Sequence, residues 1–314
     1  MSLPSGWFGR LAAPVVAAPM FLTSTPDLVV GTSASGIVGS FPALNQRSTQ
    51  GFEDWLIEIS GRLDPARDAP WGVNLVVHKS NDRLEADLAQ LVKHKVPLVI
   101  TSLGLNRDLI REVQGYGGVV FHDVISMEFA EKAIEAGVDG LIAVTHGAGG
   151  HAGVLNPFAF LQQLRTVFDG TLLLGGAVST GAQVMAARLM GADLAYIGSR
   201  FLATRESGVS ERQKAMMVDA TAEDVILTPA VSGIPANFLR QSFVGAGLDP
   251  DDRRPPEELN LTIRNKDVKP WKDLWAAGQG VGAIDDIPAV ADLCHRLREE
   301  YRAAGRHAAE LIHG

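Results

Sequence analysis

A glycine-rich loop that carries a histidine is the segment best suited to chemistry. Residues 145–153 read THGAGGHAG and directly follow the apolar run at 140–144. Four glycines in nine residues cost backbone entropy, and they allow the backbone to approach a ligand closely. His151 can abstract a proton, hydrogen-bond an anion or bind a metal, because the unperturbed pKa of imidazole lies near neutrality. The alternative is a tight turn with a solvated histidine, but a position after a strand of a repeating pattern favours a catalytic role.

Two further small-residue clusters are suited to binding an anion. Residues 175–181 read GGAVSTG and precede a predicted helix, and residues 198–201 read GSRF after the next apolar run. Backbone amides at helix N-termini bind phosphate through hydrogen bonds and the helix dipole. Either cluster alone is compatible with ordinary turns between helices and strands. Together, at the last two strands of the pattern, they predict a phosphate site formed by Gly175, Gly176, Gly198 and Ser199.

Short apolar runs alternate with amphipathic stretches over the first 200 residues or so. Apolar residues at helical spacing predict helices at 50–62, 82–95, 106–115, 126–136 and 180–190, and Thr25 with Pro26 predicts a further helix start. We expect strands at 15–20, 36–39, 71–77, 98–100, 118–122, 140–144, 171–175 and 194–198. Eight such units predict a closed α/β barrel, a TIM (β/α)8 barrel. An open doubly wound sheet is the alternative, but the GxGxxG turn after the first strand is missing.

The barrel prediction identifies the residues to inspect. Active sites of parallel barrels form at the C-terminal ends of the strands. The residues at those ends are Met20, Asn74, Thr101, Ser102, His122, Asp123, His151, Gly175, Gly176, Gly198 and Ser199. A metal site made of His151, His146 and His122 is disfavoured, because these histidines lie on different loops without a supporting carboxylate pattern.

The alternating pattern breaks after the eighth strand. Residues 206–270 contain a helical stretch at 210–220 and a polar, proline-containing stretch at 249–257 that predicts an exposed loop. We therefore divide the chain into a barrel at 1–208, a small inserted lid at 209–270 that covers the substrate, and C-terminal helices at 271–314 that complete the barrel domain. Apolar residues at helical spacing in 288–312 predict a helix for barrel packing or a dimer contact.

Composition and charge exclude several classes of function. The formal net charge is −8, which argues against a nucleic-acid or anionic membrane surface. The single cysteine, Cys294, leaves no second thiol for an internal disulfide or a CxxC pair and favours a reducing cytoplasm. No stretch approaches about 20 uninterrupted apolar residues, so we expect neither a membrane span nor a signal peptide.

These motifs resemble the nitronate monooxygenase family, formerly 2-nitropropane dioxygenases, which are FMN-dependent barrels. The family also includes flavin-dependent enoyl-acyl-carrier-protein reductases and NAD(P)H:quinone reductases. The resemblance lies in the stretches APM at 18–20, GVNL at 72–75, AGGHAG at 148–153, GAD at 191–193, GSRFLAT at 198–204 and WAAGQG at 275–280. Compared with the family pattern, Gly147 replaces a frequent glutamate, Ala177 replaces the second glycine of a common pair, and Asp123 stands where some members have lysine.

The resemblance implies roles for individual residues. Met20 and Asn74 would lie along the flavin, Gly176, Gly198 and Ser199 would hold its phosphate, and His151 would be the active-site histidine. Gly150, Gly175, Gln279 and Gly280 complete the cofactor site that we predict, with no metal.

The function that we predict is the oxidation of alkyl nitronates with O2, using FMN and His151. A reductase that passes electrons from NAD(P)H through the flavin to an enoyl thioester or quinone is the alternative. A flavin-binding regulatory or storage barrel is disfavoured by the histidine in the glycine-rich loop. The expected partners are a small molecule and O2, with a homodimer possible.

Overall fold

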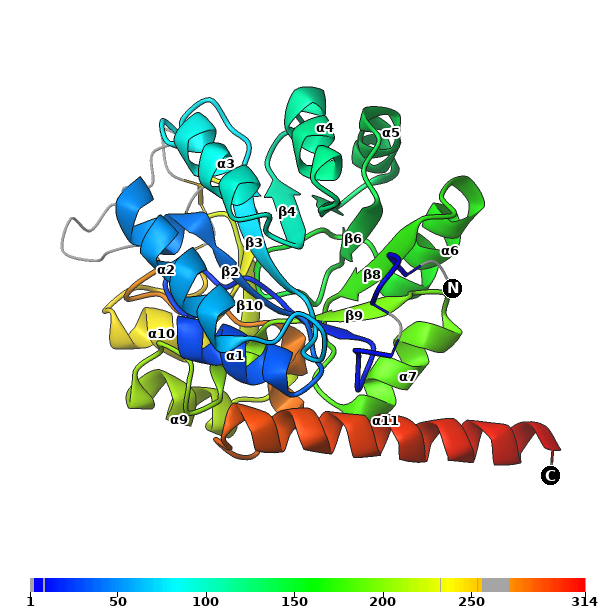
Figure 1. Ribbon diagram of the computed structural model, residues 1–314. Coiled ribbons are helices and arrows are strands. Elements are labelled where there is room, and N and C mark those ends of the chain that lie inside the picture. Colours follow the sequence, from blue (N-terminus) through cyan, green and yellow to red (C-terminus); the bar gives the residue numbers. More distant parts are fainter. Residues whose placement is uncertain (1–2, 8, 232, 253, 256–270, 314) are drawn as a thin grey trace.

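Eight parallel strands form the centre of the protein (Figure 1). The computed structural model describes residues 3–7, 9–231, 233–252, 254–255 and 271–313. Neighbouring strands follow the order β1-β9-β8-β6-β5-β4-β3-β2. Their bounds are β1 (Val15–Ala17), β2 (Gly39–Pro42), β3 (Trp71–Val76), β4 (Leu98–Ser102), β5 (Val119–Val124), β6 (Gly140–Val144), β8 (Thr171–Gly175) and β9 (Leu194–Ile197).

Val38 closes the sheet into a barrel. Its N–H donates to the carbonyl oxygen of Val15 at 3.2 Å, and its own carbonyl oxygen accepts the N–H of Ala17 at 2.8 Å. The predicted (β/α)8 barrel is therefore confirmed. The second strand begins three residues later than the predicted 36–39, because Gly36 has a left-handed backbone (φ +78°) in the turn that follows the first helix.

Helices surround the barrel and follow the strands in turn. Side chains that accept backbone N–H groups fix several helix starts, such as Thr25 before the first helix and Ser48 before the second. The helices are α1 (Pro26–Ala34), α2 (Thr49–Arg62), α3 (Leu84–Lys93), α4 (Arg107–Gly115), α5 (Met127–Ala136), α6 (Pro157–Val167), α7 (Gly181–Leu189) and the short α8 (Ser199–Leu202). None of the helices that the structure describes has the length and apolar character needed to cross a membrane.

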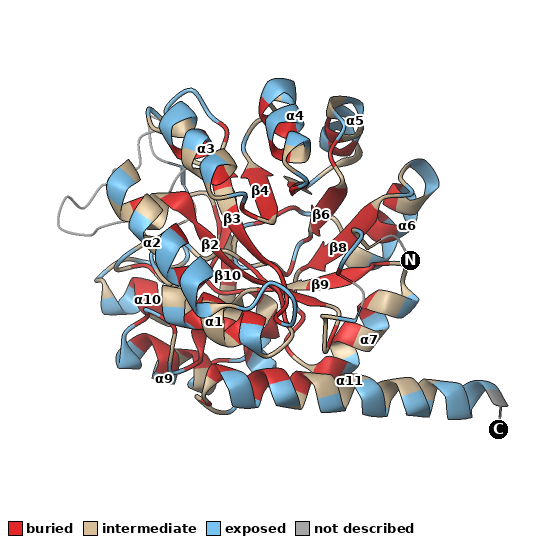
Figure 2. Cartoon of the chain, viewed as in Figure 1, coloured by how far each residue is buried: buried red, intermediate tan, exposed pale blue. Residues whose placement is uncertain are grey.

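The alternation of side chains along each strand creates two cores. Val16, Ile100, Phe121 and Leu173 point inward and fill the barrel, and Trp7 packs on Phe121 with ring centroids 5.7 Å apart. Their neighbours point outward and form a larger apolar layer with the helices. Figure 2 shows the barrel strands buried along most of their length, whereas the helices around them are buried mainly on the side that faces the strands. The filled interior leaves only the strand ends for a site.

The segment after β9 contains both helices and strands. Its described elements are α9 (Glu211–Asp219), the 3₁₀ turn η2 (Ala222–Asp224), β10 (Val225–Thr228), β11 (Ala236–Leu239) and α10 (Arg240–Gly245). β11 pairs antiparallel with β10 and also with β7 (Gly150–His151), which belongs to the barrel loop. The segment is thus joined to the histidine loop by main-chain hydrogen bonding. The predicted lid boundary at 270, and residues 253, 256 and 257 of the predicted exposed loop, lie outside the described residues.

The C-terminal segment returns to the barrel. It includes the 3₁₀ turn η3 (Gln279–Ala283) and the long helix α11 (Val290–His313), which packs against α7 and α1. The C-terminal end of α11 projects beyond the barrel (Figure 1). The division into three domains stays a prediction.

Candidate functional site

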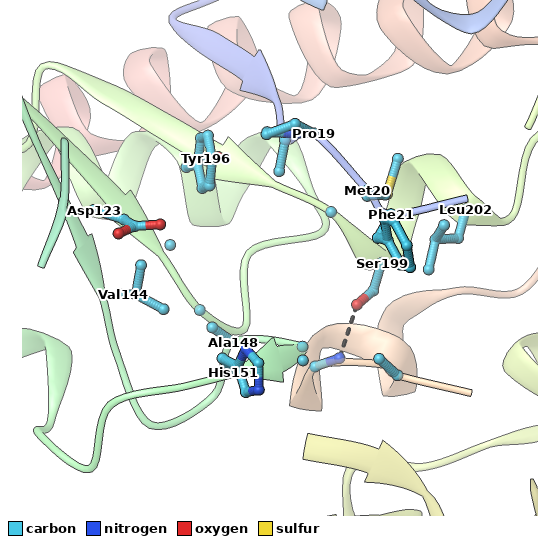
Figure 3. Close-up of a pocket in the computed structure, with 18 of the residues that line it drawn as sticks. Pro19, Met20, Phe21, Asp123, Val144, Ala148, His151, Tyr196, Ser199 and Leu202 are labelled. Carbon is cyan, nitrogen blue, oxygen red and sulfur yellow. Dashed lines mark hydrogen bonds between the residues drawn. The ribbon is translucent and has the colours of Figure 1, made fainter. Parts of the chain in front are cut away.

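A cavity of about 410 Å³ lies at the C-terminal ends of the strands. Its walls come from strand ends, from the histidine loop, from the loops after β8 and β9, and from residues 271–280. In Figure 3, Asp123, Tyr196 and His151 stand on different sides of this space, with Met20 and Ser199 farther along it.

The period of two along the strands explains which side chains reach the cavity. The inward residues two positions beyond the filled core are Asn74, Ser102, Asp123, Val144, Gly175 and Tyr196, and each of them lines the cavity. Thr101 and His122, which precede Ser102 and Asp123, are buried on the opposite side of the sheet. The hydroxyl oxygen of Thr101 lies 2.8 Å from Nδ1 of His122. His122 is thus a buried structural histidine and does not line the cavity, and burial lowers its pKa to about 4.

A chain of hydrogen bonds crosses three strands at the cavity wall. Nδ2 of Asn74 donates to the hydroxyl oxygen of Ser102 at 2.7 Å, and the Ser102 hydroxyl donates to Oδ2 of Asp123 at 2.6 Å. Burial raises the pKa of Asp123 to about 6, although the bond from Ser102 opposes this shift. The other carboxyl oxygen, Oδ1, is available to a molecule in the cavity.

His151 is held in place by the segment that follows the barrel. It pairs with Ala236 of β11, and its ring makes an edge contact with Trp271 at a centroid distance of 5.0 Å. Asn237 is buried and donates from Nδ2 to the carbonyl oxygens of His146 (2.8 Å) and Ala148 (2.7 Å). Although part of the His151 side chain is exposed, the surrounding cavity walls desolvate the imidazole, which lowers the pKa of His151 and favours its neutral form at neutral pH.

Small residues form a pocket at the place where the sequence predicts phosphate binding. A Cβ on Gly176 would lie 2.2 Å from Oγ1 of Thr145, and a Cβ on Gly280 would lie 2.4 Å from Oγ of Ser179. The Ser179 hydroxyl is buried without a protein hydrogen-bond partner, and the residue lines the cavity. An unpaired buried hydroxyl is costly unless a ligand satisfies it, so this corner fits a polar group such as a phosphate.

The N-terminus of α7 is less available than the sequence predicts. The side chain of Gln183 accepts the N–H groups of Ser179 and Thr180, and the carboxylate of Glu300 accepts the N–H of Gly181 at 2.7 Å. In α8, the N–H groups of Phe201 and Leu202 donate to the carbonyl oxygen of Gly198 at 2.9 and 3.2 Å, so only the N–H groups of Ser199 and Arg200 are left without an acceptor in the helix. The Ser199 hydroxyl accepts the N–H of Gly278 at 2.8 Å (Figure 3). An anion in this pocket would therefore contact the N–H groups at the start of α8 and the Ser179 hydroxyl rather than the N–H groups at the start of α7.

The structure brings nearly all the predicted site residues to one cavity. Those that line it are Met20, Asn74, Gly150, His151, Gly175, Gly176, Gly198, Ser199 and Gly280. Gln279 is not among the lining residues, but its N–H donates to the carbonyl oxygen of Gly147 at 3.0 Å, so it braces the histidine loop. Sequence reasoning missed Tyr196, Asn237 and Trp271, and it included Ser179 only as part of the anion-binding stretch 175–181. Only Tyr196 carried a usable signal, since strand alternation from Leu194 places it inward.

The site and fold together define a class of protein, a (β/α)8-barrel enzyme with its site at the strand C-termini. The nitronate monooxygenase family model matches residues 79–300, and the chain belongs to this family of flavin-dependent oxidoreductases. It is 28% identical to a nitronate monooxygenase of Paraburkholderia phytofirmans over 92% of each chain. It is 26% identical, over 89% of this chain and 90% of the relative, to the (3aS,4S,5R,7aS)-5-hydroxy-7a-methyl-1-oxo-octahydro-1H-indene-4-carboxyl-CoA dehydrogenase of Rhodococcus jostii. The nitroalkane oxidase structure from Streptomyces ansochromogenes shares the fold, with a TM-score of 0.79, 23% identity and coverage of 95% and 98%.

Proposed function

We propose that the protein is an FMN-dependent nitronate monooxygenase that oxidises alkyl nitronates with O2. The observation that carries the proposal is that one cavity contains both His151 on its glycine-rich loop and the small-residue pocket around Ser179. FMN requires a pocket for its phosphate, and its substrate requires a group that can exchange a proton or donate a hydrogen bond. The similarity to the Paraburkholderia enzyme over nearly the whole chain supports the same activity.

The residues of the cavity fit FMN. Gly176, Ser179, Gly198, Ser199 and Gly280 would surround the phosphate. Of these, Ser179 is the group that the protein itself leaves unpaired. Met20 and Asn74, which also line the cavity, would lie along the ring system, with Gly150 and Gly175 close to it. The bound flavin supplies the redox chemistry, and the protein supplies orientation and electrostatics.

His151 would act on the substrate. Because burial favours its neutral form, it can accept a proton from the α-carbon of a neutral nitroalkane, and it can donate one N–H to a nitronate oxygen. The edge contact with Trp271 and the β11 pairing restrict its orientation. Trp271 also lines the cavity and would help to exclude water from the reacting atoms.

Anaerobic mixing tests the proposal. The purified protein should carry a yellow flavin, identified as FMN by mass spectrometry, and a nitronate alone should bleach it rapidly. His151→Ala should keep the flavin and lose most turnover. Absence of flavin, or full turnover by His151→Ala, would each contradict the proposal.

A second candidate is an NAD(P)H-dependent reductase for enoyl thioesters or quinones. The relationship to a carboxyl-CoA dehydrogenase of Rhodococcus jostii supports a thioester substrate. The same anaerobic experiment separates the two functions. Flavin bleached by NADH or NADPH but not by a nitronate, and then reoxidised by an enoyl thioester or quinone, would identify the reductase.

A further inference from the structure

Asp123 is the one carboxylate among the described residues that line the cavity, and this lining includes no lysine or arginine. The strand packed on one side, β4, presents Ser102, and the strand on the other side, β6, presents Val144. The other titratable groups that line the cavity are Tyr196 of β9 and His151. His122, on the same strand as Asp123, lies on its outer side with Thr101. The charge of Asp123 is therefore balanced by no cation of the lining.

The surroundings of Asp123 suit a carboxyl group that gains and loses a proton. The Ser102 hydroxyl holds Oδ2, and Ser102 is in turn held by Asn74, so the carboxyl group has a fixed orientation. The second oxygen can donate a hydrogen bond when protonated and accept one when ionised. In addition, burial raises the pKa of Tyr196 and the charge of Asp123 raises it further, so the ionised carboxylate also acts on another group of the cavity.

We propose that Asp123 is the proton-binding group of the cavity, which takes up a proton from solvent whenever negative charge enters the site. The proposal rests on the proposed flavin site. It makes Asp123 a group that acts on the cofactor and on anionic substrates by charge, a role separate from that of His151.

The proton balance can be stated for reduction by an added reductant. If two electrons and one proton are added to the oxidised flavin, its charge becomes more negative by one, and Asp123 would bind a second proton from solvent as its carboxylate becomes a carboxylic acid. Within a cavity of about 410 Å³, a new negative charge lies close enough to strengthen proton binding by Asp123 on the order of tenfold or more. Since the pKa of Asp123 in the free protein is about 6, the extra uptake should be greatest near pH 6.5.

Proton uptake on reduction with dithionite tests this inference without any turnover. With the FMN-loaded protein in weak buffer, a pH indicator dye should report about half a proton more per two electrons at pH 6.5 for the wild type than for Asp123→Asn. The difference should nearly vanish at pH 5, where Asp123 is protonated before reduction, and at pH 8.5, where it stays ionised throughout. Equal uptake by the two proteins at pH 6.5 would overturn the proposal.

Two control variants make the result specific. Tyr196 lines the same cavity as Asp123, and the Tyr196→Phe variant should retain the wild-type proton uptake at pH 6.5. Ser102→Ala removes the hydrogen bond that favours the ionised carboxylate, so it should move the pH of greatest extra uptake upward without abolishing it. Loss of the extra uptake in Tyr196→Phe would assign the proton to Tyr196 and refute the role of Asp123. A protein that binds no flavin would instead contradict the proposed function, so the two failures are distinguishable.

Discussion

The protonation state of His151 should set the acid limit of activity on neutral nitroalkanes. Only the neutral imidazole can accept the α-proton, and burial lowers the pKa of His151 below its ordinary 6.5. We therefore expect kcat/KM to hold down to about pH 6.5 and to fall only below it, as His151 becomes protonated. The profile is measured on Asp123→Asn, which removes the other cavity group that titrates nearby. An acid limb centred above pH 6.5 would argue against His151 as the base.

Ala177 is held in an unfavourable backbone conformation. Its φ of +56° lies in the left-handed region, where a side chain costs about 1 kcal/mol and glycine is tolerated. A Cβ on Gly147 would lie only 3.0 Å from the Ala177 Cβ, so the missing side chain at 147 leaves room for the one at 177.

Ala177→Gly relieves this strain but also adds flexibility to the unfolded chain, so we expect the free energy of unfolding to change by less than about 1 kcal/mol. Urea denaturation measures the change. Ala148→Gly is the matched control, because Ala148 is not among the residues with a positive φ, and the added flexibility of its unfolded chain should make that variant less stable. We expect Ala177→Gly to be clearly more stable than Ala148→Gly, and equal destabilisation of the two variants would show that the left-handed backbone carries no strain here.

At the scale of elements, β11 fixes the histidine loop. Asn237 provides two N–H donors to the carbonyl oxygens of His146 and Ala148, across a wide separation in sequence. Replacing it by leucine keeps a similar volume but leaves both carbonyl oxygens without these donors. We expect a loss of about 1–3 kcal/mol in the free energy of unfolding. We also expect kcat to fall more than flavin affinity, since the loop carries His151.

Asn237→Asp tests the same two hydrogen bonds, because it replaces the amide donor by a carboxyl group whose protonation depends on pH. At neutral pH a carboxylate would face two carbonyl oxygens and repel them, so the variant should be at least as unstable as Asn237→Leu. At acid pH the protonated carboxyl group can donate one hydrogen bond and should restore part of the stability. Thermal unfolding at pH 5 and pH 7.5 measures both variants. A leucine variant that melts and turns over like the wild type would refute the role of the asparagine.

The elements differ in how well the sequence predicts them. The barrel strands are predictable because each is a short apolar run bounded by helical stretches, and the alternation within them also predicts that Ser102 and Asp123 face inward. The hairpin of β10 and β11 was missed. Its strands are four residues long and bounded by Pro229 and Pro235, and β11 finds its second partner, β7, far away in the chain. Contacts of that range leave no local pattern, and the bracing of the loop by Asn237 was missed for the same reason.

At the scale of the whole molecule, Arg200 joins the cavity loop after β9 to the C-terminal segment. Although it belongs to the GSRF stretch, its side chain is buried and points away from the cavity lining. Its guanidinium donates to the carboxylate of Asp286 at 2.6 Å and to the carbonyl oxygen of the same residue at 3.1 Å. Arg296 of α11 bonds the same carboxylate at 2.6 Å. The motif thus combines a cavity-lining residue, Ser199, with a structural anchor.

Arg200→Met should weaken this anchor while leaving the cavity lining intact. We expect a loss of about 1–3 kcal/mol in the free energy of unfolding, because hydrogen bonds to a charged group are removed while Asp286 keeps Arg296. The arginines lower the pKa of Asp286, so their stabilisation is present above its unfolded pKa near 3.8 and is lost as pH falls through the lower folded value. The gap between variant and wild type should therefore be full at pH 7 and narrow below pH 3.8 in denaturant titrations. If the gap stays constant over that range, the anchor acts through packing of the Arg200 side chain and not through its charge.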